Sequence, residues 1–383
     1  MRVCLDLSAA AHERAGLGRY AASLAHALLD LGLPLTAFIN DLRESRLRPP
    51  LSELPMRTAG LPRQRWRLRA AASYFGARSM DHAFGGIDLF HATEHLLPVL
   101  RGARSVFTLH DAAYVHFPQY HLPRNRLFLR LMMPRFLARA QAVITVSEFT
   151  RQDAVRLYHV PSDRLHVIPE GVDAAFHPIA EADTLAQVRQ RYRLPERFIM
   201  YVGTIEPRKN LITLIEAYAA LRHRAPAAAP PGLVIAGGKG WLYEEFFDRL
   251  RALGLEEAVT LTGYVPDSDL PGLVNCASVF AFPSLFEGFG LPVLEAMACG
   301  VPVVCSTAAS LPEVSGEAAL LVPPQDVAAW AEALARVLGD SQLAAKLRAQ
   351  GLARAATFTW EAAARQTMQV YEAVMRGQSA HRP

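Results

Sequence analysis

The chain has 383 residues, of which 51% are hydrophobic and 20% are charged. That length predicts two domains of about 150–200 residues each, and the composition excludes a disordered chain. The net charge is only +4, and no nucleic-acid-binding motif accompanies the basic segments, so we expect no nucleic-acid partner.

Short apolar segments alternate with helical patterns along the first half of the chain, which is typical of a parallel sheet covered by helices. The predicted strands are Arg2–Leu7, Leu35–Asn40, Leu89–His91, Ser105–Leu109, Ala142–Val146 and His166–Ile168. Two of the helices predicted between them are Tyr20–Leu31 and Leu127–Ala140. The first half therefore predicts a Rossmann-like α/β domain.

The second half repeats this pattern after a Gly- and Pro-containing boundary at 170–178. Its predicted strands are Phe198–Val202, Leu233–Ala236, Val259–Thr262, Val279–Phe282, Val301–Cys305 and Ala319–Leu321. A surface loop is expected at 225–232 and a last helix from Trp360 to about Met375. The predicted domains are residues 1–172 and 173–358, followed by a C-terminal segment, 359–383.

Nothing in the sequence predicts a membrane span, a secretion signal or a metal site. No apolar run approaches the ~18 residues that a span needs, and Asp6 interrupts the N-terminal apolar segment. The cysteines show neither metal-ligand spacing nor a disulfide framework: Cys4, Cys276, Cys299 and Cys305. We therefore expect a cytoplasmic protein with no metal.

A glycine motif, Gly16-Leu-Gly18-Arg-Tyr-Ala21, follows the first predicted strand and opens a helix. Together with Asp41, near the end of the second strand, it matches the permissive dinucleotide fingerprint. An NAD(P)-dependent oxidoreductase is therefore the alternative function. Residues 9–15 argue against it, because the fingerprint places its glycines in a tight turn directly after the strand.

Two arginine-rich segments with interleaved apolar residues lie at 43–78 and 124–139. Such a pattern is typical of peripheral contact with anionic lipid headgroups, and a solvated helix face is the alternative. The first interpretation predicts peripheral attachment to the inner face of the cell membrane through these segments.

Polar or charged side chains follow three predicted strands, at the edge of an α/β sheet where ligands bind. His110 ends the strand SVFTL, and Ser147 ends the strand AVITV, where it is expected to cap a helix. Arg208 and Lys209 precede a helix after FIMYVGT. Two cations at a helix start oppose the helix dipole, which favours a bound anion such as phosphate.

The segment FEGFGLPVLEAMACGVP, residues 286–302, places Glu287 before a predicted helix and Glu295 within it. Its glycines allow backbone amides to approach a ligand, and the helix N-terminus attracts anions. A diphosphate there would have a carboxylate on each side to accept hydrogen bonds from sugar hydroxyls.

Asp267-Ser-Asp269 has the form of a metal-binding motif. Because Leu270 and Pro271 follow it, we instead expect an aspartate of this motif to cap the helix that starts there.

Six motifs in this order resemble the retaining glycosyltransferases of family 4, which have the GT-B fold of two facing Rossmann-like domains. The motifs are GLGRY (16–20), TLHD (108–111), IPEGVD (168–173), GTIEPRKNL (203–211), TGYVPDSDL (262–270) and FEGFGLPVLEAMACGVP (286–302). At position 170 the family often has asparagine, whereas this chain has Glu170. The resemblance further implies that the last helix crosses back to the N-terminal domain.

The resemblance implies transfer of a hexose from a nucleotide diphosphate-sugar to a saccharide or lipid-linked saccharide in polysaccharide or glycolipid synthesis. The EPRKN turn is similar to that of bacterial mannosyltransferases that use GDP-mannose, and a UDP-sugar is the alternative donor. The implied catalytic residues are His110, Arg208, Lys209 and Glu287. The implied donor-binding residues are Gly16, Gly18, Gly203, Arg208, Lys209, Tyr264, Val265, Glu287, Gly288, Phe289, Gly290, Leu291 and Glu295. No metal and no further cofactor is expected.

Overall fold

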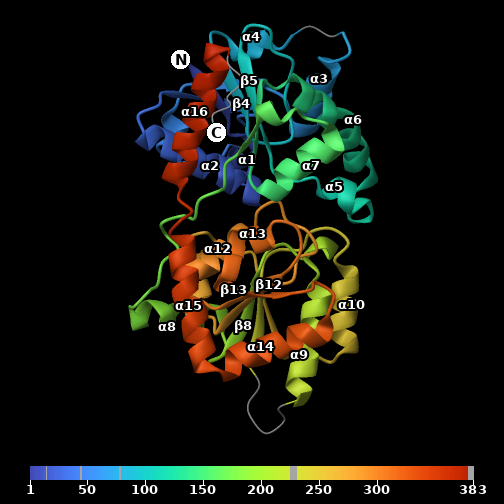
Figure 1. The fold of residues 1–383 in the computed structure, drawn as a ribbon, viewed down its shortest axis with the longest axis vertical. Helices are drawn as coiled ribbons and strands as arrows, with labels where there is room; N and C mark the ends of the chain where they lie inside the picture. Colours follow the sequence, from blue (N-terminus) through green and yellow to red (C-terminus); the bar gives the residue numbers. More distant parts are fainter. Residues whose placement is uncertain (14, 44, 77–78, 225–230, 378–383) are drawn as a thin grey trace. The chain divides into compact units, whose positions relative to one another are not determined.

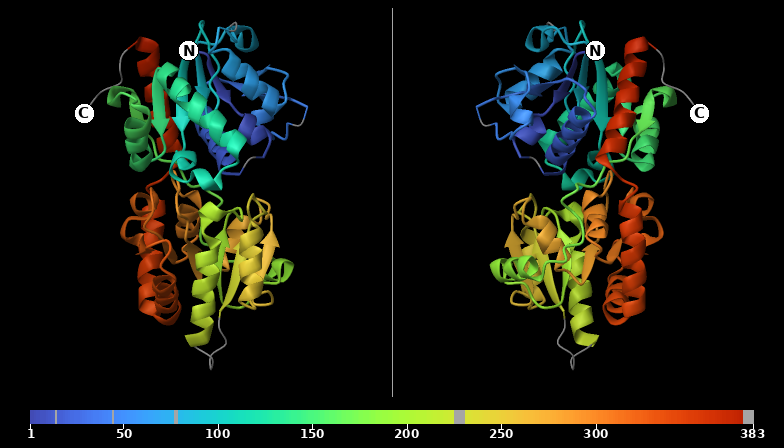
Figure 2. Two further views of the ribbon diagram at one scale, coloured as in Figure 1. Left: turned by 90° about the vertical axis from the view of Figure 1, so that its right-hand side faces the viewer. Right: turned by 90° about the vertical axis from the view of Figure 1, so that its left-hand side faces the viewer.

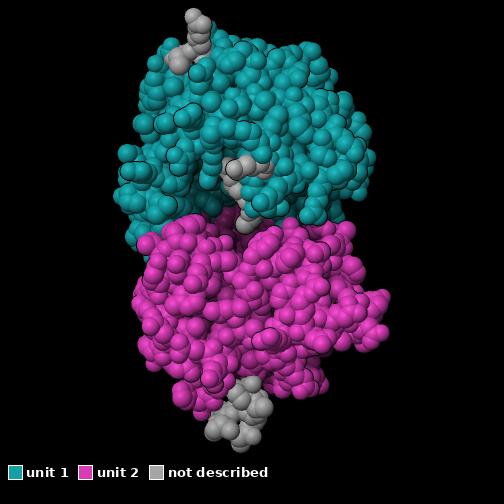
Figure 3. All heavy atoms as spheres, turned by 180° about the vertical axis from the view of Figure 1, so that it is seen from behind, with its two compact units in different colours: residues 1–171, 359–383 teal, residues 172–358 magenta. Residues whose placement is uncertain are grey.

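The computed structural model describes residues 1–13, 15–43, 45–76, 79–224 and 231–377. The chain divides into two compact units (Figure 3), one formed by residues 1–171 and the segment from Thr359 onward, the other by residues 172–358. The change of unit falls one residue before the position expected from the sequence. Each unit is a parallel sheet with helices on both faces (Figures 1 and 2).

The described residues of the first unit form a seven-stranded sheet in the order β3-β2-β1-β4-β5-β6-β7. The strands are β1 (Val3–Asp6), β2 (Leu35–Ile39), β3 (Met56–Thr58), β4 (Leu89–Ala92), β5 (Arg104–Leu109), β6 (Ala142–Thr145) and β7 (Leu165–Val167). The α-helices are α1 (Ser8–Ala11), α2 (Ala15–Asp30), α3 (Arg63–Ala72), α4 (Asp81–Phe84), α5 (Ala113–His116), α6 (Pro123–Arg139), α7 (Glu148–Tyr158) and α16 (Trp360–Arg376).

The described residues of the second unit form a six-stranded sheet in the order β10-β9-β8-β11-β12-β13. The strands are β8 (Phe198–Val202), β9 (Gly232–Ala236), β10 (Val259–Gly263), β11 (Val279–Phe282), β12 (Val303–Ser306) and β13 (Ala319–Val322). The α-helices are α8 (Ala182–Tyr192), α9 (Leu211–Arg224), α10 (Glu244–Ala252), α11 (Leu270–Asn275), α12 (Leu291–Ala298), α13 (Leu311–Ser315), α14 (Val327–Gly339) and α15 (Ser341–Ala355). Short 3₁₀ turns connect several elements in both units.

Both sheets reverse their winding direction at one position. In the first unit β1 is hydrogen-bonded to β2 on one side and to β4 on the other, and in the second unit β8 lies between β9 and β11. In open α/β sheets, ligands bind beyond the carboxyl ends of the strands at such a switch point. The segments that follow β8 and β11 therefore lie where a ligand of the second unit is expected to bind.

The sequence-predicted strands are present with small shifts at their ends, because buried parallel strands are near-continuous apolar runs. The edge strand β3 and the helix α1 were missed, since each is only three or four residues long. The helix predicted at Tyr20–Leu31 begins earlier, at Ala15. Most of the loop predicted at 225–232 lies outside the described residues.

The last helix, α16, packs within the first unit beside α2. The ring of Trp360 lies 5.8 Å from that of Tyr20, and buried Tyr371 is hydrogen-bonded through Oη to Nδ1 of His91 at 2.6 Å. The other ring nitrogen of His91 is 2.7 Å from Oγ1 of Thr108 on β5. Burial first, and the neighbouring His110 second, lower the pKa of His91 to about 3, so this imidazole is neutral. A buried polar chain thus ties α16 to the centre of the first sheet.

Candidate active site at the switch point of the second sheet

Four charged side chains meet beyond the carboxyl ends of β8 and β11. Lys209 Nζ lies 2.6 Å from Oε1 of Glu287, and Arg208 Nη1 lies 3.1 Å from Oε2 of the same carboxylate. The second terminal nitrogen of the Arg208 guanidinium, Nη2, donates to Glu206 Oε1 at 2.7 Å. These side chains are between 2% and 15% exposed. Two cations and two carboxylates are therefore buried together at the switch point.

The cations determine the protonation state of Glu287. Burial alone would raise the pKa of this carboxyl, but the charges of Lys209 and Arg208 outweigh it and lower the pKa to about 2. Glu287 is consequently ionised throughout the physiological range. An ionised carboxylate acts only as a hydrogen-bond acceptor, which suits it to sugar hydroxyls.

The cations do not need a ligand to balance their charge, contrary to the reasoning from sequence. Arg208 and Lys209 lie in a 3₁₀ turn, Pro207–Lys209, and Asn210 separates them from α9, so they are outside the helix's first turn. Glu206 and Glu287 already supply the negative charge. A phosphate would therefore have to replace Glu287 as the partner of these cations, at least in part.

Asn210 fixes the turn that carries the two cations. Its backbone is left-handed, with φ of 57°, a conformation that asparagine tolerates better than most residues. Its amide Nδ2 donates to the carbonyls of Pro283 and Pro324 at 3.0 and 2.5 Å. Asn210 thereby joins the turn after β8 to the segments that follow β11 and β13.

Ser310 holds the loop between Glu287 and α12. Its buried hydroxyl lies 2.9 Å from the carbonyl of Glu287 and 2.8 Å from that of Phe289. In a trans peptide the next N–H points away from the preceding C=O. The amides of Gly288 and Gly290 therefore face away from Ser310.

Gly290 is the N-cap of α12 and has φ of 115°. A Cβ atom there would lie 2.7 Å from Cδ2 of Leu311, so both backbone conformation and space favour glycine. Leu291 opens the helix and Pro292 lies in its first turn, while Glu295 is one turn further on and 2% exposed. The predicted placement of the two glutamates, one before the helix and one within it, is confirmed.

Hydrogen bonds join the carboxyl ends of β8, β9 and β10. Gly203 donates its N–H to Ala236 O at 2.9 Å, and Gly237 donates to Gly263 O at 2.8 Å. After β10, the Tyr264 side chain is 71% exposed and Val265 is buried. The residues expected to meet the donor's base and phosphates therefore lie on adjoining loops of one sheet edge.

His110 belongs to the first unit, directly after β5. Its Nε2 lies 2.8 Å from the backbone carbonyl of Thr93, and its Nδ1 lies 3.5 Å from Glu170 Oε1. The ring of Tyr20 meets the His110 ring edge-on, with centroids 4.7 Å apart. The predicted cap is also present nearby, because Ser147 Oγ accepts from the N–H of Thr150 at 3.1 Å.

Two family models and several relatives match this chain. The model of glycosyltransferase family 4 matches residues 14–176, and that of glycosyl transferases group 1 matches residues 186–354. O-antigen chain mannosyltransferase B of Escherichia coli is 36% identical over 81% of this chain and 77% of its own length. The chain belongs to glycosyltransferase family 4.

Other relatives of this glycosyltransferase are also mannosyltransferases. The MMP α-(1→4)-mannosyltransferase of Mycolicibacterium hassiacum is 32% identical over 82% of this chain and 76% of its own length. The serotype-specific mannosyltransferase WbdA of Escherichia coli is 34% identical over 62% of this chain, which spans only 29% of WbdA. Among solved structures, sucrose-phosphate synthase from Thermosynechococcus elongatus is 25% identical with a TM-score of 0.77, covering 99% and 100% of the two chains. The fold is GT-B, as predicted.

The oxidoreductase alternative is not supported. Gly16 and Gly18 lie inside α2 rather than in a tight turn after β1, and α1 separates them from the strand. A Cβ atom on Gly18 would lie 2.8 Å from the Ala9 carbonyl, so this glycine permits α1 and α2 to pack closely. Asp41, the expected ribose ligand, pairs with Arg43 at 2.8 Å.

Asp269 is the N-cap residue of α11 but its carboxylate does not cap the helix, so that part of the prediction is wrong. Its Oδ2 instead accepts from Arg191 Nη1 and Tyr192 Oη, both at 2.6 Å. The bonds from Tyr192 and then Arg191 lower the pKa of Asp269. Within the described ranges, no group of three His, Cys, Asp or Glu residues is placed to hold a metal ion.

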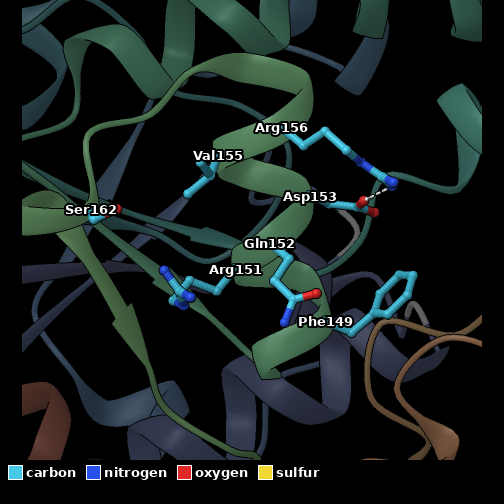
Figure 4. Close-up of a pocket in the computed structure, with 7 residues that line it drawn as sticks. All are labelled: Phe149, Arg151, Gln152, Asp153, Val155, Arg156 and Ser162. Atoms are coloured by element: carbon cyan, nitrogen blue, oxygen red, sulfur yellow. Dashed lines mark hydrogen bonds and ion pairs between the residues drawn. The ribbon is translucent and has the colours of Figure 1, made fainter.

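A depression of about 450 Å³ lies along α7 in the first unit of the glycosyltransferase (Figure 4). Asp153 at its edge is buried and pairs with Arg156 at 2.8 Å and with His116 at 2.7 Å. Arg151 pairs with Glu148 at 2.7 Å. The charged side chains that line the depression are thus paired with neighbouring charged side chains.

None of the helices in the described ranges combines the length and the hydrophobicity that a membrane span requires.

The sequence did not reveal the roles of Glu206 and Ser310 in the site, or the place of Glu170. Glu206 stands in the quoted motif beside Arg208 but was not recognised as its partner. Ser310 carries no local signal, because its bonds reach back more than twenty residues to Glu287 and Phe289. Glu170 was noted from sequence as a departure from the family that could alter hinge packing or acceptor preference, and the structure places its carboxylate beside His110.

Proposed function

We propose that this glycosyltransferase transfers mannose from GDP-mannose, with retention of configuration, to a saccharide or lipid-linked saccharide in surface polysaccharide or glycolipid synthesis. A UDP-sugar is the alternative donor. The buried pair Arg208 and Lys209, at the switch point of the second sheet, is the observation that carries the proposal. The names of the mannosyltransferase relatives favour mannose.

In this proposal Arg208 and Lys209 bind the donor diphosphate, with the amides of Gly288 to Leu291 beside them. Negative charge develops on the diphosphate as the bond to the sugar breaks, and fixed cations at that position stabilise the transition state. No nucleophilic side chain is assigned. The donor phosphate itself would assist attack by the acceptor from the same face of the sugar, and neither metal nor further cofactor takes part.

The remaining groups would bind the other parts of the donor. Glu287 would accept hydrogen bonds from the sugar ring hydroxyls once the diphosphate takes over the cations. Glu295 would accept from the ribose, and the backbone at Tyr264 and Val265 would meet the base. His110 would bond to the distal hydroxyl of the sugar. These roles follow the resemblance, and the burial of both carboxylates supports them.

The test compares two lysine variants for sugar transfer and donor hydrolysis, with GDP-mannose and UDP-glucose as donors. Lys209→Ala removes a charge-assisted contact worth about 2–4 kcal/mol in the transition state, so the rate should fall ~30- to 1000-fold. Lys346→Ala is the matched control, because this exposed lysine lies on α15. Activity of Lys209→Ala within threefold of the parent would refute the phosphate role.

We further propose that one face of the first unit contacts anionic lipid at the inner surface of the membrane. Arg67 on α3 contacts α6 through Asn125 at 2.9 Å and lies 4.1 Å from the Phe128 ring, so the two helices are neighbours. The α3–α6 face consists of the following exposed residues: Arg65, Leu68, Arg69, Phe75, Leu127, Arg130, Leu131 and Arg135. Arg43 and Arg46, from the same basic segment, pair instead with Asp41 and Glu13.

Sedimentation with vesicles tests this contact. Each arginine near an anionic surface contributes about 1 kcal/mol, so Arg65→Ala with Arg130→Ala should weaken binding to phosphatidylglycerol vesicles by roughly 30-fold. Arg365→Ala with Arg376→Ala on α16 is the matched control, since both arginines are exposed and paired within their helix. Equal binding of phosphatidylcholine vesicles, or equal loss in both double variants, would refute the contact.

A further inference from the structure

Glu170 places a buried carboxylate beside His110. The residue follows β7, is 6% exposed, and its Oε1 lies 3.5 Å from Nδ1 of the imidazole. The side chain of His110 is equally enclosed, at 10% exposed. The two groups are thus neighbours, and a hydroxyl group that reached them could donate its hydrogen to the carboxylate.

The orientation of His110 leaves one ring nitrogen for this role. Nε2 lies 2.8 Å from the carbonyl of Thr93, and a carbonyl can only accept, so Nε2 carries a hydrogen. The edge of the Tyr20 ring packs against the imidazole. Nδ1 is therefore the nitrogen that can meet a substrate, and it faces Glu170.

The backbone around Glu170 is held on both sides. Before it, Ile168 donates its N–H to Thr145 O at 2.9 Å. After it, Gly171 passes so close to α16 that a Cβ atom there would lie 2.2 Å from the backbone nitrogen of Trp360. The carboxylate consequently occupies a defined position relative to His110, within one unit of the protein.

We propose that Glu170 makes the enzyme selective for donors whose sugar carries a hydroxymethyl group at its distal carbon. This inference rests on the proposed function, in which His110 meets that substituent. Glu170 and Nδ1 of His110 are both acceptors, and a hydroxyl that lies beside them can donate its hydrogen to either. A sugar carboxylate would face Glu170 with like charge, and a methyl group would offer no hydrogen to Glu170 or to Nδ1 of His110.

The test measures kcat/KM for GDP-mannose, GDP-6-deoxymannose and GDP-mannuronate in the parent enzyme and in Glu170→Gln. A site built to bond a hydroxyl rejects an analogue that lacks it by up to roughly 10⁴-fold, so the parent should strongly prefer GDP-mannose. Glu170→Gln removes the negative charge, so its mannuronate-to-mannose ratio should rise at least tenfold. Glu181→Gln is the matched control, because the side chain of Glu181 is exposed and makes no capping hydrogen bond at the start of α8.

Glu170→Asp, which keeps the charge, should retain the parent's rejection of mannuronate and thereby separates charge from packing. Binding of GDP-mannuronate, followed by calorimetry, gives a second readout if Glu170→Gln turns over slowly. An unchanged mannuronate-to-mannose ratio in folded Glu170→Gln would overturn the proposal. Should the parent transfer no sugar from GDP- or UDP-hexoses, the proposed function itself fails. If only UDP-hexoses react, the comparison is made with UDP-glucose and UDP-glucuronate.

Discussion

Replacing Glu287 by Gln should change how the stability of the second unit depends on pH. The pKa of Glu287 is about 2 in the folded protein against an ordinary value of 4.5. A folded-state pKa that is lowered adds stability above the unfolded pKa, and this stability is lost as pH falls toward the folded pKa. The difference corresponds to about 3 kcal/mol at pH 7, since each pKa unit is worth about 1.4 kcal/mol.

Glu287→Gln should therefore be about 3 kcal/mol less stable than the parent at pH 7, and the two proteins should converge between pH 4.5 and 2. Hydrogen exchange of the β11 and β12 amides measures the free energy of opening of this unit. Glu181→Gln, with an exposed side chain, should match the parent at every pH. A deficit in Glu287→Gln that stays constant with pH, or no deficit at pH 7, would refute the account of the charge cluster.

Three further outcomes are expected. Glu295→Gln should raise the donor's KM and leave kcat nearly unchanged in steady-state kinetics, because ribose contacts are made equally in ground and transition states; a loss confined to kcat would contradict this role. Saturating EDTA should leave transfer intact, and activity restored by manganese would show that Asp267 or Asp269 binds metal. Tyr371→Phe should cost about 1–3 kcal/mol in urea unfolding, because His91 Nδ1 loses its partner; full stability would show that the bond contributes nothing.

The sequence predicts the sheets well for a physical reason. Strands such as Val279–Phe282 are buried on both faces, so their residues are apolar regardless of what packs beside them. Met56–Thr58 is only partly buried at the sheet edge and reads as part of an arginine-rich loop. Short elements leave too few residues for a periodic pattern, which is also why α1 was missed.

The candidate site is only partly readable because its ion pairs join distant parts of the chain. Local patterns place Lys209 after one strand and Glu287 after another, but 78 residues separate them, and only the fold makes them partners. Asp269 shows the same limit: it occupies a cap position, yet Arg191, 78 residues away, takes its carboxylate. Sequence locates chemical groups at strand ends, and tertiary contacts decide what those groups bind.

The packing of α16 within the first unit has a consequence for the folding of the protein during its translation. Residues 172–358 form one continuous stretch of chain and can fold as soon as they leave the ribosome. The first unit, although begun earlier, lacks α16 until the ribosome has passed through the whole of the other unit. During that interval the buried His91 is without Tyr371, and the α2 surface around Tyr20 is without Trp360. The half of the protein that is synthesised first is thus the last to be completed.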